Sequence, residues 1–210
     1  MIITYQGIGA IKIQHGDTTV AFNPPSKKSA FSGTSFGADI VLITANHEDL
    51  NGSEMASRND KEAFVIDGPG EYEVNNFFIK GFSSKTKYGG KERINTIYTI
   101  TIDNINIAYL GALSETELSS EAREELGTAD ILFVPIGNEG TLNSEEAYKI
   151  AVKIEPAIII PIHYGKVGES DALKKFLKEG GQEDIKPIEK LTLKKKDLIG
   201  KEGEIVVLKF

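Results

Sequence analysis

His47 and Asp49 are the two residues whose types and spacing most directly suggest chemistry. They follow the apolar, β-branched run of residues 40–43, which predicts a buried strand within the stretch 38–52. A strand that ends in an imidazole and a carboxylate places them on an exposed loop held by a rigid scaffold. Because they are two positions apart, both side chains can point to the same side of an extended chain or loop. Such a pair can ligate a metal ion or act as general acid and base.

A second strand end carries the other candidate, His163. The apolar run of residues 157–160 predicts a buried strand, and the stretch 161–165 that follows it contains this histidine. The chain has 3 histidines. The remaining one, His15, lies in a predicted hairpin turn, where we expect it to be solvated. The candidate site residues are therefore His47, Asp49 and His163.

The composition narrows the class of protein. The 210 residues are 40% hydrophobic and 26% charged, which is typical of a globular protein and sufficient for one well-cored domain over residues 1–210. Cysteine is absent, which excludes a disulfide framework, a thiolate metal site and a cysteine nucleophile. The net charge of -7 argues against nucleic acid as a partner. No apolar run is long enough to span a bilayer and no leader is recognisable, so we expect a cytoplasmic protein without a membrane partner.

The first part of the chain is predicted to be rich in strands. Period-two alternation of apolar residues and the turn signals between them define these strands, while the polar stretch 83–92 is expected to be a loop. The predicted strands cover residues 2–6, 10–14, 18–22, 38–43, 63–66, 71–74, 77–81, 94–102 and 106–110.

The second part is predicted to alternate strands with helices. Ser114 and then Asn143 or Ser144 are typical N-caps, and Gly180 is a typical helix stop. The predicted helices cover residues 114–126, 144–153 and 170–178, and the predicted strands cover 130–135, 157–160 and 204–209. Together the two parts predict an α/β fold with two sheets and helices outside them.

Several stretches, in the right order along the chain, carry a resemblance to a known family. They are residues 3–13, Phe22-Asn23-Pro24, residues 38–51, Leu110-Gly111-Ala112, and residues 130–137 with 144–164. The chain resembles the metallo-β-lactamase fold superfamily, in the branch of small metal-dependent hydrolases that includes the ascorbate-phosphate lactonases. In that family these stretches hold the opening strand pair, an aspartate-proline, an HxHxDH motif, a glycine-aspartate and the last histidine-bearing strand. The resemblance implies a four-layer αββα sandwich of two mixed β-sheets with outer helices.

The resemblance also assigns the metal ligands of the family to positions of this chain, and most of them differ. The ligand positions that keep a donor are His47, Asp49 and His163. Those that have lost it are Ala45, Leu50 and, at the metal-bridging aspartate, Ala112. No histidine is present for the mid-chain ligand, and two neighbouring positions also depart from the family, namely Ile8 and Asn23.

Too few donors remain for the two metal ions that the family holds. Catalytic zinc needs three protein ligands and an open position for water, and the bound cation makes that water a nucleophile at neutral pH. We therefore expect no cofactor. The alternative is one weakly held zinc or manganese ion on His47, Asp49 and His163, with Asp49 catalytic if that reduced site is active. Without metal, Asp49 can orient an imidazole ring by a hydrogen bond.

Three hypotheses about function follow from these residues. The favoured one is a fold member whose dinuclear site is largely lost, and which serves as a non-hydrolytic binding or assembly module for a small molecule or a protein partner. The alternative is a metal-dependent hydrolase of a small phosphorylated or lactone substrate that uses the reduced site. The third is a subunit of a homo- or hetero-oligomer, with the apolar strand of residues 94–102 exposed at the interface.

Overall fold

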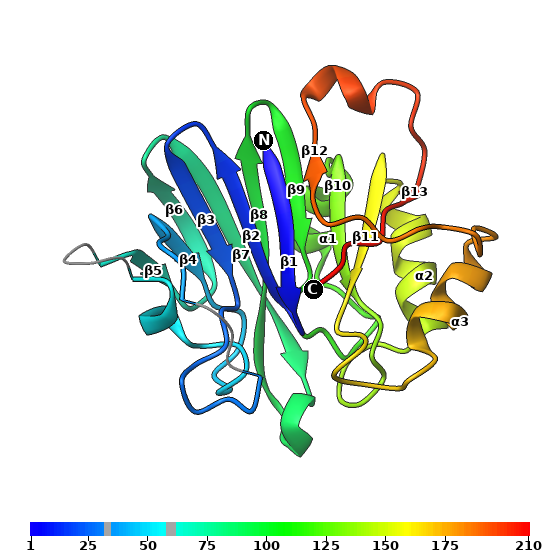
Figure 1. The fold of residues 1–210 in the computed structure, drawn as a ribbon, viewed down its shortest axis with the longest axis horizontal. Coiled ribbons are helices and arrows are strands. Elements are labelled where there is room, and N and C mark those ends of the chain that lie inside the picture. Colours follow the sequence, from blue (N-terminus) through cyan, green and yellow to red (C-terminus); the bar gives the residue numbers. More distant parts are fainter. Residues whose placement is uncertain (32–34, 58–61) are drawn as a thin grey trace.

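Two β-sheets form the centre of the molecule (Figure 1). The computed structural model describes residues 1–31, 35–57 and 62–210. In this part of the chain, the six-stranded sheet has the order β12 (Leu191–Thr192), β1 (Ile2–Gly7), β2 (Ala10–His15), β3 (Thr18–Phe22), β4 (Ile40–Leu42) and β5 (Phe64–Ile66). The seven-stranded sheet has the order β13 (Glu204–Ile205), β11 (Ile158–Ile162), β10 (Ile131–Pro135), β9 (Ile105–Tyr109), β8 (Arg93–Ile102), β7 (Phe77–Thr86) and β6 (Gly70–Val74).

The α-helices of the described chain lie on the side of the seven-stranded sheet (Figure 1). They are α1 (Ser120–Leu126), α2 (Ser144–Ile154) and α3 (Ala172–Glu179). Of these, α1 contacts β8, α2 contacts β10 and α3 packs on α2. On the six-stranded sheet, Phe36 and Ala56 from the segment 35–57 pack in one cluster with Val41 and Ile43. The predicted sandwich of two mixed sheets is confirmed, and its helical layer covers one of them.

Burial follows the sequence pattern of each strand. In β1, the alternating residues Ile3 and Tyr5 point into the core between the sheets. In β10 and β11 every residue is buried, because the seven-stranded sheet has the other sheet on one side and helices on the other. The prediction of an exposed apolar strand over 94–102 is wrong. Ile94 is 64% exposed, but the other apolar side chains of this strand are buried, namely Ile97, Tyr98, Ile100 and Ile102.

Strand β7 is longer than its sequence predicts. The loop expected over residues 83–92 begins only after Thr86, because Ser84 still pairs with Asn95 of β8. The Ser84 hydroxyl donates to the Asn95 carbonyl at 2.9 Å, which ties this polar end of β7 to its neighbour. The polar composition of the segment predicts a loop, because it gives no sign of these cross-strand hydrogen bonds.

The helix boundaries are confirmed in part. Asn143 caps α2 with a reciprocal capping box, and α3 ends at Gly180 as predicted. The helix expected from Ser114 begins instead at Ser120, because the backbone N–H and the hydroxyl of Ser114 both donate to the Lys85 carbonyl. The closing strand is also shorter than predicted: β13 ends at Ile205, and an isolated bridge follows further on.

None of the helices in the described ranges has the length and the apolar character needed to cross a membrane.

Candidate functional site

The site lies where the carboxyl ends of parallel strands from both sheets meet. Strands β3 and β4 run parallel in one sheet, and β9, β10 and β11 run parallel in the other. Asn23, directly after β3, donates through Nδ2 to Thr44 Oγ1 at 2.9 Å and to Tyr109 Oη at 3.0 Å. The Thr44 N–H donates back to Asn23 Oδ1 at 2.8 Å. These buried bonds join the two sheets at the edge where α/β folds commonly place their ligands.

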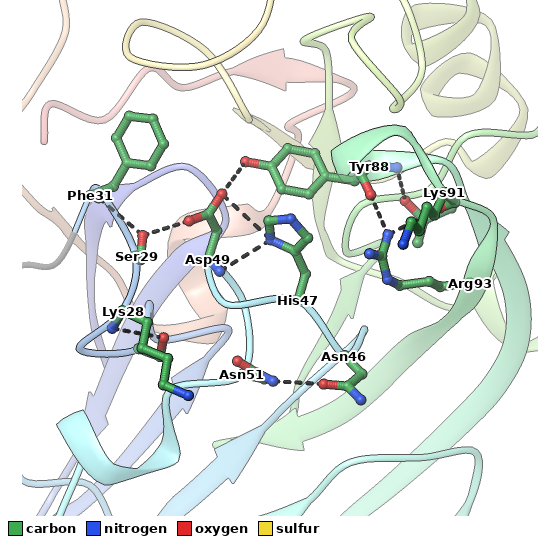
Figure 2. A network of polar contacts seen from close by, with 12 residues as sticks. Lys28, Ser29, Phe31, Asn46, His47, Asp49, Asn51, Tyr88, Lys91 and Arg93 are labelled. Atoms are coloured by element: carbon green, nitrogen blue, oxygen red, sulfur yellow. Dashed lines mark hydrogen bonds and ion pairs between the residues drawn. The ribbon is translucent and has the colours of Figure 1, made fainter.

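The carboxylate of Asp49 is the centre of a polar network (Figure 2). Ser29 Oγ donates to Asp49 Oδ1 at 2.5 Å, and Tyr88 Oη donates to Asp49 Oδ2 at 2.9 Å. His47 Nδ1 lies 3.5 Å from Asp49 Oδ2. The structure therefore brings His47 and Asp49 together, and two hydroxyl groups are the hydrogen-bond donors to the carboxylate.

Both ring nitrogens of His47 lie close to neighbouring groups. The Asp49 backbone N–H donates to His47 Nδ1 at 3.2 Å. His47 Nε2 faces Gly89, where a Cβ atom would lie 2.4 Å from it. Gly89 also has a φ of 71°, which an L side chain rarely adopts. Glycine at this position therefore lets the short helix η2 (Tyr88–Gly90) approach the imidazole.

Tyr88 contacts all three candidate residues. Its ring centroid lies 4.9 Å from that of His47 and 5.4 Å from that of His163, with both pairs edge-on. Its hydroxyl bonds to Asp49. Burial, followed by the negative charge of Asp49, raises the pKa of the Tyr88 phenol well above its usual value. The phenol therefore keeps its proton and remains a donor to the carboxylate.

His163 is fully buried at the end of β11. It adopts a left-handed backbone with φ 59°, and its N–H donates to the Ile8 carbonyl at 2.6 Å. Within the described residues, neither ring nitrogen has a hydrogen-bond partner. Burial lowers the pKa of His163 to about 3, so the ring is neutral under ordinary conditions. Its contact in the site is the Tyr88 ring.

Apolar side chains fill the positions at which the resemblance expects further ligands. Ala45, Leu50 and Ala112 are buried in one hydrophobic cluster with Tyr88 and Ile8. Phe31 and Val167, both partly buried, pack against this cluster. The positions that the resemblance assigns to these further ligands therefore lie in an apolar cluster.

The donors that remain do not fit a two-metal centre. In the described ranges, no three histidine, aspartate or glutamate side chains are grouped so that they could hold an ion. The Asp49 carboxylate is already bonded to Ser29 and Tyr88. The unpartnered nitrogens of His163 are free to ligate, but one imidazole does not make a metal site.

A cavity of about 780 Å³ opens beside this network. His47 and Asp49 line it at one side, together with the aromatic rings of Phe31 and Tyr88. Its remaining walls come from loops and carry both charges, namely Lys87, Glu92, Glu139 and Lys166, with Val167 and several glycines. Its volume lies in the range of small-molecule sites, and its lining offers stacking surfaces, an imidazole N–H and charged groups of both signs.

Sequence reasoning missed Ser29 and Tyr88. Both lie in polar stretches and meet Asp49 only through tertiary contacts, over separations of 20 and 39 residues. One feature of the sequence could have indicated Tyr88: it is a large aromatic residue beside Gly89 and Gly90 in an otherwise polar segment. Such a ring tends to find an apolar surrounding elsewhere in the fold.

Comparison with known proteins assigns the family. The model of the beta-lactamase superfamily domain matches residues 2–163, so the chain belongs to this family. A solved structure from Thermotoga maritima, named as a proposed Zn-dependent hydrolase of the metallo-beta-lactamase superfamily, superposes with a TM-score of 0.73. It is 26% identical, over 99% of this chain and 97% of that one. The fold of this chain is therefore the metallo-β-lactamase fold, as the resemblance implied.

Curated relatives carry related names. A UPF0173 metal-dependent hydrolase of Lysinibacillus sphaericus is 26% identical over 195 residues, which cover 78% of this chain and 85% of that protein. A UPF0173 protein of Pyrococcus furiosus is 40% identical over 73 residues, and the chain spans 33% of that protein's length. The activity in the first of these names is that of the relative which carries it.

Proposed function

We propose that this chain is a member of the metallo-β-lactamase fold that does not hydrolyse by metal-activated water and serves as a binding or assembly module. The observation that carries this proposal is the apolar cluster of Ala45, Leu50, Ala112 and Tyr88. Ala45, Leu50 and Ala112 stand where the resemblance expects metal ligands, while the remaining carboxylate of Asp49 accepts hydrogen bonds from two hydroxyl groups.

Metal-dependent hydrolysis requires a bound cation, and an apolar cluster is an unfavourable environment for its charge. A cation lowers the pKa of bound water enough to provide hydroxide at neutral pH. Burying a divalent ion against methyl groups and a phenol ring costs free energy that too few ligands would offset. The sequence has no cysteine nucleophile. It matches G-x-S-x-G once, at residues 33–37, but the next element along the chain is strand β4, whereas a nucleophile elbow leads from a strand into a helix.

The cavity beside His47 supports a small molecule as the bound partner. Its volume of about 780 Å³ suits a metabolite-sized ligand. Stacking on Phe31 or Tyr88 and a hydrogen bond with the imidazole of His47 would hold such a ligand without a reaction.

Two assays test this proposal together. Protein is purified without chelators, its metals are quantified by elemental analysis, and turnover is measured on a panel of phosphodiesters and lactones with and without added Zn²⁺ and Mn²⁺. We expect less than one ion per chain and no turnover above the rate of a His47→Ala, His163→Ala double variant. Stoichiometric metal with turnover lost in that variant would overturn the proposal.

The second candidate function is a metal-dependent hydrolase of a small phosphorylated or lactone substrate. Two observations favour it: the unpartnered ring nitrogens of His163, and the names of the relatives. In this case His47, Asp49 and His163 would hold one zinc or manganese ion, and His163→Ala would abolish both metal uptake and turnover. Turnover that survives this substitution would exclude it.

A further inference from the structure

We propose that the groove between α1 and α2 binds a small amphipathic carboxylate, a molecule with an apolar body and one carboxylate group. The groove has a volume of about 570 Å³, which lies in the range of small-molecule sites. It shares no lining residue with the cavity beside His47. The inference therefore goes beyond the proposed function and does not depend on it.

The floor of the groove is apolar. Four aliphatic side chains line it, and all of them belong to the main hydrophobic core or pack against it, namely Leu118, Leu126, Ile150 and Ile154. Ile150 and Ile154 are four positions apart, so they lie on one face of α2. Because these side chains offer no hydrogen bond, a polar group placed on them would lose its bonds to water. The part of a ligand that rests on this floor is therefore apolar.

Two unpaired cations line the same groove. Arg123 comes from α1 and Lys153 from α2, and both side chains are exposed. Within the described residues, neither of these side chains has a hydrogen bond or an ion pair, although the chain has more acidic than basic residues. A neighbouring cation of α2 does pair, since Lys149 Nζ lies 2.5 Å from Glu145 Oε1. Arg123 and Lys153 are thus available to an anion bound in the groove.

The charge of the lining favours a carboxylate as the anion. Glu117 also lines the groove, so the two cations and this acid leave one net positive charge. A carboxylate carries one negative charge, whereas a phosphate monoester carries about −1.5 to −2 at neutral pH and would be less well balanced. The Arg123 guanidinium can bind a carboxylate through two parallel hydrogen bonds, and Thr116 adds a hydroxyl to the lining.

Octanoate is the probe that tests this inference. The native chain is titrated at pH 7 by calorimetry and by NMR of its leucine, isoleucine and valine methyl groups. We expect one octanoate per chain, with the largest shifts at the four aliphatic residues of the floor. Octylammonium has the same tail with the opposite charge and should bind at least about tenfold more weakly. Butyrate lacks four methylene groups and should also bind at least about tenfold more weakly.

Substitutions at exposed positions distinguish this groove from other apolar surfaces. The double variant Arg123→Gln, Lys153→Gln should bind octanoate at least about fivefold more weakly than the native chain. Lys149→Gln is the matched control, because it removes an exposed cation of α2 that does not line the groove, and its affinity should be unchanged. Urea unfolding checks that each variant is folded.

Three results would overturn the inference. The first is a folded native chain that does not bind octanoate. The second is a double variant that binds octanoate as tightly as Lys149→Gln does. The third is a set of methyl shifts centred on Val167, in the cavity beside His47, while the signals of Ile150 and Ile154 do not move.

Discussion

The hydrogen bond between Tyr88 and Asp49 provides the sharpest test of the site's architecture. Tyr88→Phe removes only the hydroxyl that donates to Asp49 Oδ2 at 2.9 Å. A hydrogen bond to a charged group contributes roughly 1.5–3 kcal/mol to stability. Asp49 keeps its bond from Ser29 and borders a cavity that water can enter, so we expect a loss of about 2 kcal/mol.

Urea unfolding and thermal melting measure this loss. For a chain of this size, about 2 kcal/mol corresponds to a fall in the melting temperature of roughly 4–8 °C. A double-mutant cycle with Asp49→Ala isolates the pair, and we expect a coupling free energy of about 1–2 kcal/mol. Tyr72→Phe is a suitable control, because its hydroxyl donates to backbone carbonyls at a partly exposed turn and carries no charged partner. A coupling below about 0.5 kcal/mol would refute the network as described.

Three further predictions follow from the same site. Ala112→Asp places an unpaired carboxylate in the buried apolar cluster and should cost at least about 3 kcal/mol in metal-free urea unfolding, against less for Ala112→Ser. Gly89→Ala should be more destabilising than Gly90→Ala, because its Cβ would meet His47 Nε2 whereas Gly90 faces open space; both have positive φ, so equal losses would contradict the contact. His163 has a folded-state pKa of about 3, below its unfolded value, so the unfolded chain binds the extra proton first on acidification. The contribution of His163 to the free energy of unfolding should therefore be present in full above pH 6.5 and fall by roughly 1 kcal/mol per pH unit toward pH 3. This contribution to the pH dependence should be absent in His163→Gln.

Local sequence patterns were sufficient for most of the fold. Alternation placed β1, β2 and β3, and the fully apolar runs correctly indicated strands buried on both faces at β10 and β11. The capping box at Asn143 located α2, because a cap is a local interaction between residues three apart. Ser114 has the same local signature, but a tertiary bond to Lys85 decided its conformation.

The candidate site was predictable only in part. The chemistry of His47 and Asp49 follows from a strand end, and the structure places these two side chains 3.5 Å apart. The part played by Tyr88 depends on β7 continuing through a polar segment and on an approach to Asp49 across 39 residues, which no local pattern encodes. His163 lies in the site, but its ring contacts Tyr88, so the reduced set of three ligands stays a prediction.

The central claim is that hydroxyl groups of this protein, rather than metal ions, satisfy the Asp49 carboxylate beside His47. Elemental analysis of the native chain, purified without chelators and then dialysed against equimolar Zn²⁺ and Mn²⁺ in excess over protein, tests this most directly. The account predicts that, after gel filtration, the native chain retains well under one ion, no more than a variant lacking both His47 and His163. Retention of one or two ions per chain that depends on these histidines would contradict it.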